Sequence, residues 1–262
     1  MTPTASQVLP LKPLRSRVSE AEWQARLDLA AAYRLCDLYG MSDMIYTHIS
    51  VRVPDAPGQF LLNPHGLLFD EVTASSLLKV DLDGNVLEQP EGPYGLHQAG
   101  FVIHSALYRA RPDVNGAMHT HTIAGMAVSA LKCGLLPLTQ TATRFCSRLA
   151  YHDFSGPERD PNERDALARD LGTMNYMILR NHGLLTVGAT IAEAFAAMYG
   201  IERSCQAQIA AMACNTALNE MPSGIVAKSI GMYDPAVIRR YGLLEWPGLL
   251  RKLDRKDPSW RD

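Results

Sequence analysis

Helix-like and strand-like patterns alternate along the whole chain, and this alternation limits the possible folds more than any other feature of the sequence. Ser19 precedes a stretch with apolar residues at helical intervals, which ends near Gly40. Three short β-rich runs follow at residues 47–54, 59–66 and 77–88, separated by proline, glycine and an Asp-Gly pair. Since no repeat and no linker-like composition divides the chain, the sequence predicts a single α/β domain layered around a sheet.

The same alternation continues after these runs. Apolar spacing and a cap at Thr190 predict further helices. They are expected over residues 96–110, 123–133 and 190–215 and within 155–172. Strands are expected over 114–121 and, on both sides of a turn, over 176–188. The region between helix 123–133 and strand 176–188 is otherwise irregular in pattern, and the closing segment is charged and punctuated by proline. Alternation alone does not reveal the order of the strands.

The two ends of the chain differ from its middle. Residues 1–18 hold three prolines and no apolar run, so we expect a flexible N-terminal arm without a secretion signal. Residues 19–240 are expected to form the folded domain, and residues 241–262 a C-terminal extension.

The composition excludes several classes of protein. With 262 residues, 47% of them hydrophobic, the chain can bury a substantial core. Its 25 basic and 27 acidic residues leave a net charge of −2, so we expect no partner among nucleic acids or anionic membranes. No run approaches the roughly 18 apolar residues that cross a bilayer. Five cysteines without paired spacing favour free thiols in a reducing cytoplasm.

His119 and His121 are the most informative pair of polar residues, because side chains at positions i and i+2 of a strand point to the same face. Both imidazoles can then reach one cation, although one or both could simply occupy a strand end. His182 lies between two apolar runs and before Gly183, where a side chain can project from a strand end as a third ligand. The alternative to this ligand role for His182 is a hairpin turn in which Gly183 supplies a positive φ and His182 has no role.

Together these three imidazoles predict a metal site. Three neutral histidines with an open position are the ligand set of a catalytic zinc ion, whereas structural zinc sites are rich in cysteine. Zinc is the leading choice, and other divalent transition metals also accept imidazole nitrogen.

Four segments of the chain resemble the class II aldolase/adducin family, which includes metal-dependent aldolases and epimerases of fuculose phosphate and ribulose phosphate. They read HISVR at 48–52, NPHG at 63–66, LYRARPDVNGAMHTH at 107–121 and LRNHGLL at 179–185. The resemblance implies a layered α/β/α sandwich around a central, mostly antiparallel sheet. It also implies that His119, His121 and His182 bind zinc, and that the protein is a homo-oligomer, commonly a tetramer.

The resemblance also implies a reaction. In the family, zinc acts as a Lewis acid on two oxygens of a hydroxycarbonyl substrate and stabilises an enediolate, while a base moves a proton. That base is usually a glutamate four positions before the histidine that occurs here as His104, but this sequence has Gly100 there. The catalytic residue is therefore unknown.

The substrate side of the family pattern has changed as well. Two serines that precede the family's glutamate are Gln98 and Ala99 here, and the family's Gly-Asn pair is Thr47-His48. Because a phosphate dianion normally collects hydroxyls, amides and cations, the loss of these donors favours an unphosphorylated substrate. The candidate substrate-binding residues are His48, His65 and Gly66.

The other histidines have weaker arguments. Imidazole titrates near neutral pH, so His97 and His104 could supply acid or base chemistry. A simpler interpretation makes His97 a helix-start residue and His104 a hydrogen-bonded helix residue that faces the core. His152, in a polar segment, is expected at the surface or at an interface.

The leading hypothesis is a zinc-dependent lyase of the aldolase type that acts on a small hydroxycarbonyl or hydroxy acid compound. A non-catalytic, adducin-like interaction module is the alternative from another class, and Gly100 is its best support. A metal-dependent decarboxylase or epimerase is a third possibility, since it shares the metal–enediolate chemistry.

Overall fold

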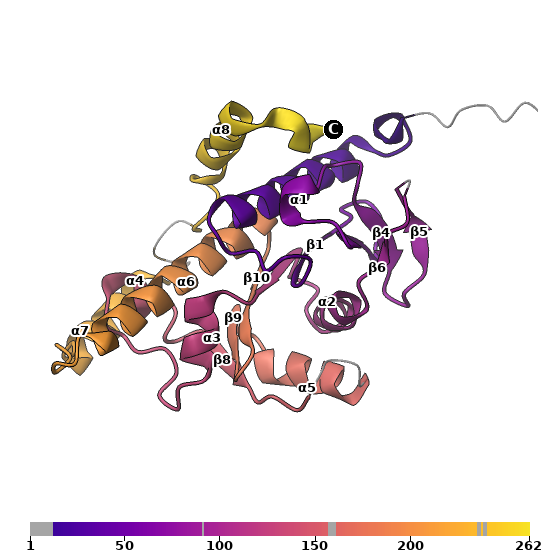
Figure 1. Ribbon diagram of the computed structural model, residues 1–262. Helices are drawn as coiled ribbons and strands as arrows, with labels where there is room; N and C mark the ends of the chain where they lie inside the picture. Colours follow the sequence, from indigo (N-terminus) through magenta and orange to yellow (C-terminus); the bar gives the residue numbers. More distant parts are fainter. Residues whose placement is uncertain (1–12, 91, 157–160, 235–236, 238–239) are drawn as a thin grey trace, which may run out of the picture.

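The computed structural model describes residues 13–90, 92–156, 161–234, 237 and 240–262 (Figure 1). The strands are β1 His48–Arg52, β2 Gln59–Leu62, β3 Pro64–His65, β4 Leu78–Asp81, β5 Val86–Glu88, β6 Gly95–Leu96, β7 Gly116–Thr120, β8 Leu149–His152, β9 Tyr176–Leu179 and β10 Gly183–Gly188. Eight of them form one sheet in the order β5-β4-β2-β1-β7-β10-β9-β8, and β3 pairs with β6.

Neighbouring strands of the large sheet are antiparallel, except that β8 and β9 run parallel. The exception follows from the connection, because the chain leaves β8, passes through α5 (Pro161–Leu171) and returns to the sheet in the same direction. The mostly antiparallel sheet implied by the family resemblance is therefore confirmed.

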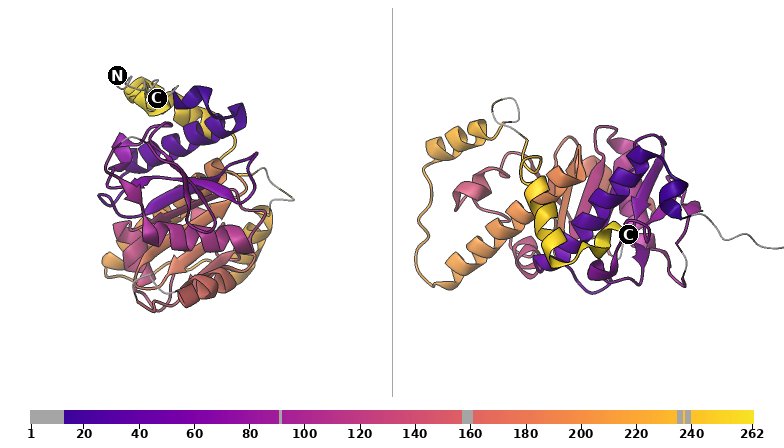
Figure 2. Two further views of the ribbon diagram at one scale, coloured as in Figure 1. Left: turned by 90° about the vertical axis from the view of Figure 1, so that its right-hand side faces the viewer. Right: turned by 90° about the horizontal axis from the view of Figure 1, so that it is seen from above.

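Helices cover both faces of the sheet, so the layered α/β/α sandwich is also confirmed (Figures 1 and 2). The helices are α1 Glu20–Leu38, α2 Gln98–Ala110, α3 Ile123–Ser129, α4 Gln140–Thr143, α5, α6 Ile191–Ala213, α7 Ser223–Met232 and α8 Trp246–Lys256; short 3-10 turns are η1 Leu14–Ser16, η2 Phe69–Glu71 and η3 Pro258–Arg261. α1 and α6 pack on one face, and α2 and α5 pack on the other.

Two apolar cores lie on the two faces of the sheet. Leu29 of α1 and Phe195 of α6 belong to the first core, and Leu107 of α2 and Leu167 of α5 belong to the second. All residues of the central strands β7 and β10 are buried, because helices cover these strands on both sides. Polar side chains on these strands are therefore enclosed unless they lie at a strand end.

The long helices begin at the predicted residues. The Ser19 side chain accepts a hydrogen bond from the Glu22 amide, 3.0 Å away. Thr190 forms a capping box with Glu193, in which each side chain accepts from the other residue's backbone amide. These caps satisfy amide groups that a helix start leaves free, and they explain why sequence predicts α1 and α6 well.

The irregular region holds a strand that the sequence pattern did not predict. β8 has only four residues, and its alternating burial is too short a pattern to stand out in the sequence. Two helices of the closing part, α7 and α8, were also not predicted.

Residues 241–262, expected as an extension, pack against the domain. The side chains of Trp246, Leu253 and Trp260 are buried in the core on the α1 face. The Trp260 carbonyl accepts a hydrogen bond from the Ala74 amide, 3.1 Å away.

Of the expected flexible arm, residues 1–12 lie outside the described residues. Residues 13–18 contain η1, and Arg17 forms an ion pair with Glu88 of β5 at 2.9 Å. No helix in the described part of the chain is long and apolar enough to span a membrane.

Candidate metal centre

The three histidines singled out in the sequence meet at one end of the central strands. His119 lies in β7, His121 follows this strand, and His182 lies in the turn between β9 and β10. The Nε2 atom of His121 lies 2.9 Å from the Nε2 atoms of both His119 and His182. One ligand atom from each residue lies within 4.8 Å of the others, so this cluster could hold a metal ion.

The second nitrogen of two of these rings is anchored by an oxygen atom. His119 Nδ1 lies 2.9 Å from the carbonyl oxygen of Leu184, and His121 Nδ1 lies 3.1 Å from a carboxylate oxygen of Asp43. Both oxygens accept hydrogen bonds, so we assign the ring protons to Nδ1, which leaves the Nε2 lone pairs turned toward the shared point. Burial, followed by the neighbouring His182 and His121, lowers the pKa of His119 well below its usual value. This keeps His119 in the neutral form that a metal requires.

The donor set fits a divalent transition metal. Bare nitrogens 2.9 Å apart repel one another unless a proton or a cation lies between them. Nitrogen ligands of tetrahedral zinc, at about 2.0–2.1 Å from the ion, are separated by about 3.3 Å, which is close to the spacing found here.

The turn that carries His182 is shaped by its neighbours. Asn181 has the positive φ of 57°, so the alternative in which Gly183 supplies it is wrong. Gly183 is required for another reason, because a Cβ atom there would lie 2.4 Å from the carbonyl oxygen of Thr120. Ser129 of α3 also holds the turn, since its carbonyl accepts from the Asn181 amide and its hydroxyl accepts from the His182 amide.

The space beside Gly100 is filled by the ring of His48. A Cβ atom at position 100 would lie 2.8 Å from Cγ of His48 and 2.9 Å from its Cδ2. Positions 48 and 100 therefore share one space, and the absence of a side chain at position 100 leaves room for the imidazole of His48.

Seven of the eight histidines form one continuous array. His48 pairs with His119 across β1 and β7, and their ring centroids are 5.0 Å apart. His97 lies 5.3 Å from the His48 ring and 4.6 Å from the ring of His65. The substrate-side candidates His48 and His65 are thus connected to the metal candidates through ring contacts. Gly66, the third candidate, lies against Tyr94, with no room for a Cβ atom between them.

His97 and His104 occupy the places expected of helix residues. His97 caps α2, and its Nδ1 accepts a hydrogen bond from the Gly100 amide at 3.0 Å. His104 is fully buried, and its Nε2 lies 2.7 Å from Nδ1 of His48. Burial lowers the pKa of His104 to about 3, so its ring is neutral.

His152 is outside this array and is buried in the chain, whereas the sequence predicted a position at the surface or at an interface. It is 8% exposed at the end of β8, where Nδ1 lies 2.6 Å from a carboxylate oxygen of Asp170 on α5. The unpredicted strand β8 and the covering helix α5 bury it.

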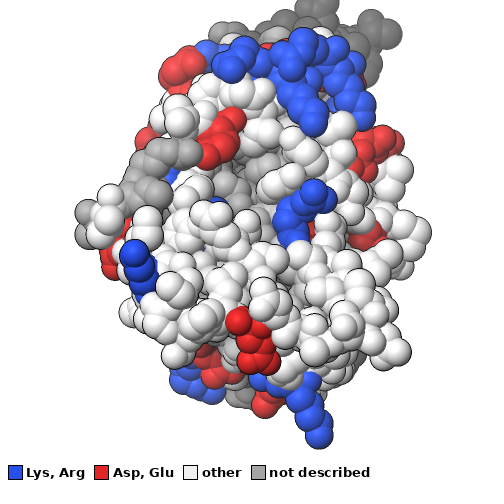
Figure 3. Space-filling model, turned by 90° about the vertical axis from the view of Figure 1, so that its left-hand side faces the viewer, with Lys and Arg blue, Asp and Glu red and all other residues white. Residues whose placement is uncertain are grey.

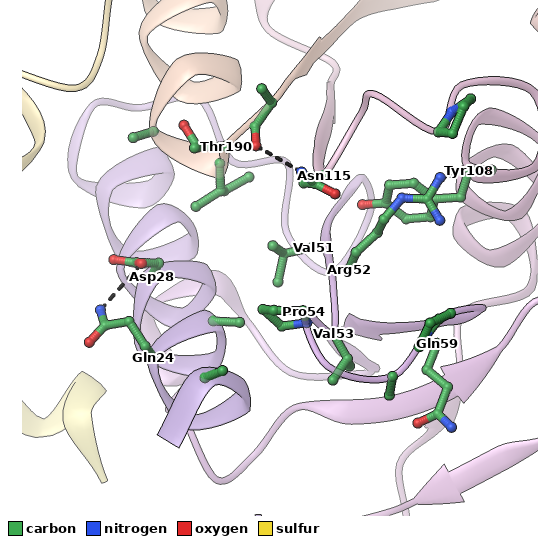
Figure 4. Close-up of a pocket in the computed structure, with 18 of the residues that line it drawn as sticks. Gln24, Asp28, Val51, Arg52, Val53, Pro54, Gln59, Tyr108, Asn115 and Thr190 are labelled. Carbon is green, nitrogen blue, oxygen red and sulfur yellow. Dashed lines mark hydrogen bonds between the residues drawn. The ribbon is translucent and has the colours of Figure 1, made fainter. Parts of the chain in front are cut away.

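A cavity of about 690 Å³ lies at the other end of β1 from His48. Figure 4 shows Arg52 and Tyr108 together on one side of it and residues of α1, including Asp28, on the other. The Arg52 guanidinium stacks on the Tyr108 ring at 4.5 Å and donates to the Val114 carbonyl. These contacts hold Arg52 in the fold. Tyr108, which lines this cavity, is hydrogen-bonded through Ser50 to His104 of the histidine array.

Three polar residues near the array were missed by sequence reasoning. They are Asp43, which anchors His121, and Ser50 and Tyr108, which continue the hydrogen bonds of His104. Only the position of Ser50, two residues after His48 in a predicted strand, gave a signal that it shares a face with that histidine.

Fold and site together define a protein of the class II aldolase type. A family model described as the class II aldolase and adducin N-terminal domain matches residues 27–209, and the chain belongs to this family. A Caulobacter vibrioides protein whose name places it among the aldolase class 2 proteins is 49% identical over 98% of this chain and 100% of its own length. Alpha-adducin of Rattus norvegicus is 44% identical over 79% of this chain, which spans 29% of that protein.

Solved structures agree with this assignment. An aldolase II superfamily protein from Pseudomonas syringae has 45% sequence identity and a TM-score of 0.89, covering 95% of this chain and 99% of that one. An L-fuculose 1-phosphate aldolase from Glaciozyma antarctica has 29% identity and a TM-score of 0.81, covering 93% of each chain.

Proposed function

We propose that the protein is a metal-dependent lyase of the aldolase type that acts on a small, unphosphorylated hydroxycarbonyl or hydroxy acid compound. The observation that carries the proposal is the convergence of three histidine Nε2 atoms, two of whose rings are held by oxygen acceptors. Zinc is the metal we propose, because the ligands are all imidazole.

His119, His121 and His182 would hold the ion. When bound, the ion would supply Lewis-acid stabilisation of negative charge on a substrate oxygen as a carbon–carbon bond breaks. His48 and His65, which the array connects to the three ligands, would bind the substrate together with Gly66, the residue after His65. Gln98 and Ala99, at the start of α2, offer no hydroxyl for a phosphate group. No base is assigned to position 100.

The first test is metal content. Purified protein should hold about one zinc ion per chain, and His119→Ala, His121→Ala and His182→Ala should each lose it while His152→Gln, outside the array, retains it. Stoichiometric zinc in all three alanine variants would refute the metal site. Incubation of zinc-loaded protein with a panel of hydroxy acids and hydroxyketones, with detection of released aldehyde or carbon dioxide, would then identify the reaction.

A non-catalytic module is the second candidate, supported by the 44% identity to alpha-adducin and by Gly100. A scaffold has no chemical need for three imidazole nitrogens that converge on one point. The module is favoured if wild-type protein neither binds metal nor transforms any compound of the panel. Decarboxylation or epimerisation by the same site would be separated from aldol cleavage by the products.

We also propose that the protein is a homo-oligomer, with a tetramer favoured by the family resemblance. α7 has no buried residue, and Ile225 and Met232 on it are 51% and 59% exposed. Figure 3 looks onto the side from which α7 projects, and most of that face is uncharged. α7 contacts α4 of its own chain but leaves these apolar side chains exposed, which favours a contact with another copy. Light scattering should give a mass above 28.8 kDa, and Ile225→Lys should lower it.

The cytoplasm is the compartment we propose. Cys36 and Cys205 are buried free thiols, and none of the five cysteines is bonded to another. Thiol labelling of denatured protein from freshly lysed cells should modify all five.

A further inference from the structure

A chain of hydrogen bonds runs from Tyr108 to His48, between helix α2 and strand β1 of the sheet. The Tyr108 hydroxyl lies 2.8 Å from the Ser50 hydroxyl, which in turn bonds Nδ1 of His104. Nε2 of His104 lies 2.7 Å from Nδ1 of His48. All four residues are buried, with exposures between 0% and 3%, so water does not compete for these bonds.

Which residue donates in each of these hydrogen bonds can be worked out step by step, starting from Tyr108. The only hydrogen-bond partner of the Tyr108 hydroxyl in the described part of the chain is Ser50. Burial raises the pKa of Tyr108, so the phenol keeps its proton and must donate it to Ser50 or leave it unpaired. Leaving a buried donor unpaired destabilises the fold, so Tyr108 donates.

The donors of the other two hydrogen bonds follow, because each hydroxyl has one proton to donate and the neutral ring of His104 carries one N–H proton. Ser50 accepts from Tyr108 and donates to Nδ1 of His104. The ring proton of His104 is then on Nε2, which donates to Nδ1 of His48. Since Nδ1 of His48 accepts, the proton that its ring retains is on Nε2. Nε2 has no hydrogen-bond partner among the residues the structure describes.

We propose that His48 presents an Nε2–H donor to the candidate active site, in a tautomer fixed by the chain Tyr108–Ser50–His104, and that this donor binds an oxygen atom of the substrate. The ring occupies the space of the missing side chain at position 100, but it cannot act there as a base, because its lone pair is already used by His104. A neutral imidazole N–H is instead suited to polarise a carbonyl, hydroxyl or carboxylate oxygen. Tyr108, Ser50 and His104 are positioning residues. This proposal rests on the proposed function only for the nature of the bound molecule.

The tautomer is tested directly by nitrogen NMR on metal-free, ¹⁵N-histidine-labelled protein at neutral pH. Signals are assigned with the variants His48→Asn and His104→Gln. We expect a protonated, pyrrole-type Nε2 and a pyridine-type Nδ1 for His48. The reversed pattern, or a doubly protonated His48 ring, would overturn the proposal. The result does not depend on zinc, so it is separate from the metal test of the proposed function.

The positioning role is tested in the same spectra with Ser50→Ala, which removes the donor to His104, and with Ser50→Thr, which keeps a hydroxyl. We expect the single tautomer of His48 to persist in Ser50→Thr and to give way to a mixture in Ser50→Ala. An unchanged pattern in Ser50→Ala would show that the chain does not set the tautomer.

The substrate contact is tested by calorimetric titration of glycolate into the zinc-loaded protein. We expect His48→Asn, which keeps an N–H donor, to bind glycolate within about threefold of wild type, and His48→Val to bind it about tenfold more weakly. Equal affinities for wild type and His48→Val, at full zinc content in both, would overturn the contact.

Discussion

The array contains two groups of histidines that differ in what holds their Nδ1 atoms. In the metal group, Nδ1 of His119 and of His121 faces a carbonyl or carboxylate oxygen, so the ring proton is on Nδ1. Nε2 of each ring then has a lone pair that can bind a metal. In the donor group, Nδ1 of His97 accepts from a backbone amide, and Nδ1 of His48 accepts from His104 in the proposed chain. The same side chain therefore serves as a metal ligand or as a hydrogen-bond donor, and the partner of its second nitrogen decides which.

The sharpest way to separate the two groups is by metal retention. His182→Ala should lower zinc affinity by more than a hundredfold, because it removes one of three ligands, whereas His48→Asn should retain zinc at wild-type stoichiometry. Metal analysis after dialysis against a weak chelator measures both. Loss of zinc in His48→Asn alone would reverse the roles assigned to the two groups.

Introducing a side chain at position 100 tests whether the ring of His48 fills the space beside Gly100. Gly100→Glu should destabilise the fold by about 3 kcal/mol, because its Cβ would lie 2.8 Å from the His48 ring. The double variant Gly100→Glu with His48→Asn should recover most of this loss, which urea unfolding measures as a coupling energy. Additive effects of the two substitutions would mean that the positions do not share one space.

Asp43 tests the anchoring of the metal group. Asp43→Asn should weaken zinc binding by about 10- to 100-fold, since the carboxylate that orients His121 becomes a poorer acceptor. Zinc competition with a chromophoric chelator measures the change. Asp170→Asn, beside His152 and outside the array, is the matched control and should leave zinc affinity unchanged.

The pH dependence of stability tests the burial of His104. The pKa of His104 is about 3 in the folded protein and 6.5 without perturbation, so between these values the unfolded chain binds a proton that the folded protein excludes. The contribution of His104 to stability is therefore fully present above about pH 6.5 and is lost as the pH drops toward 3, by up to about 1.4 kcal/mol per pH unit. The buried His48 and His119, whose pKa values are also lowered, add to the wild-type slope. Urea unfolding of metal-free protein at several pH values should give a shallower slope for His104→Gln. The exposed His65→Gln should keep the wild-type slope, and an equal slope in all three proteins would contradict the buried, neutral state of His104.

The sequence predicted the elements that have helix caps or long periodic runs of apolar residues. The caps Ser19 and Thr190 and long apolar periods predict α1 and α6, and β9, β10 and their turn follow from two apolar runs around Asn181. The strand β8 escaped prediction because four residues carry too little periodicity and its pairing with β9 depends on a distant crossover.

The site residues also fall into those that a local pattern predicts and those that it does not. Strand alternation predicts that His119 and His121 share a face, and a turn between two strands can place His182 beside them. Nothing local predicts Asp43 as their anchor or Tyr108 as the start of the chain to His48, since these contacts join residues 78 and 58 positions apart.

By itself, the sequence determined which residue types alternate along the strands, where the long helices begin, and that three imidazoles occur at spacings suited to a metal. Only the tertiary structure decided that the ring of His48 fills the space beside Gly100 and which nitrogen of each histidine is free. The physical reason is that a hydrogen bond's direction depends on both partners, and here the partners are brought together by packing between α2 and the sheet, not by their distance along the chain.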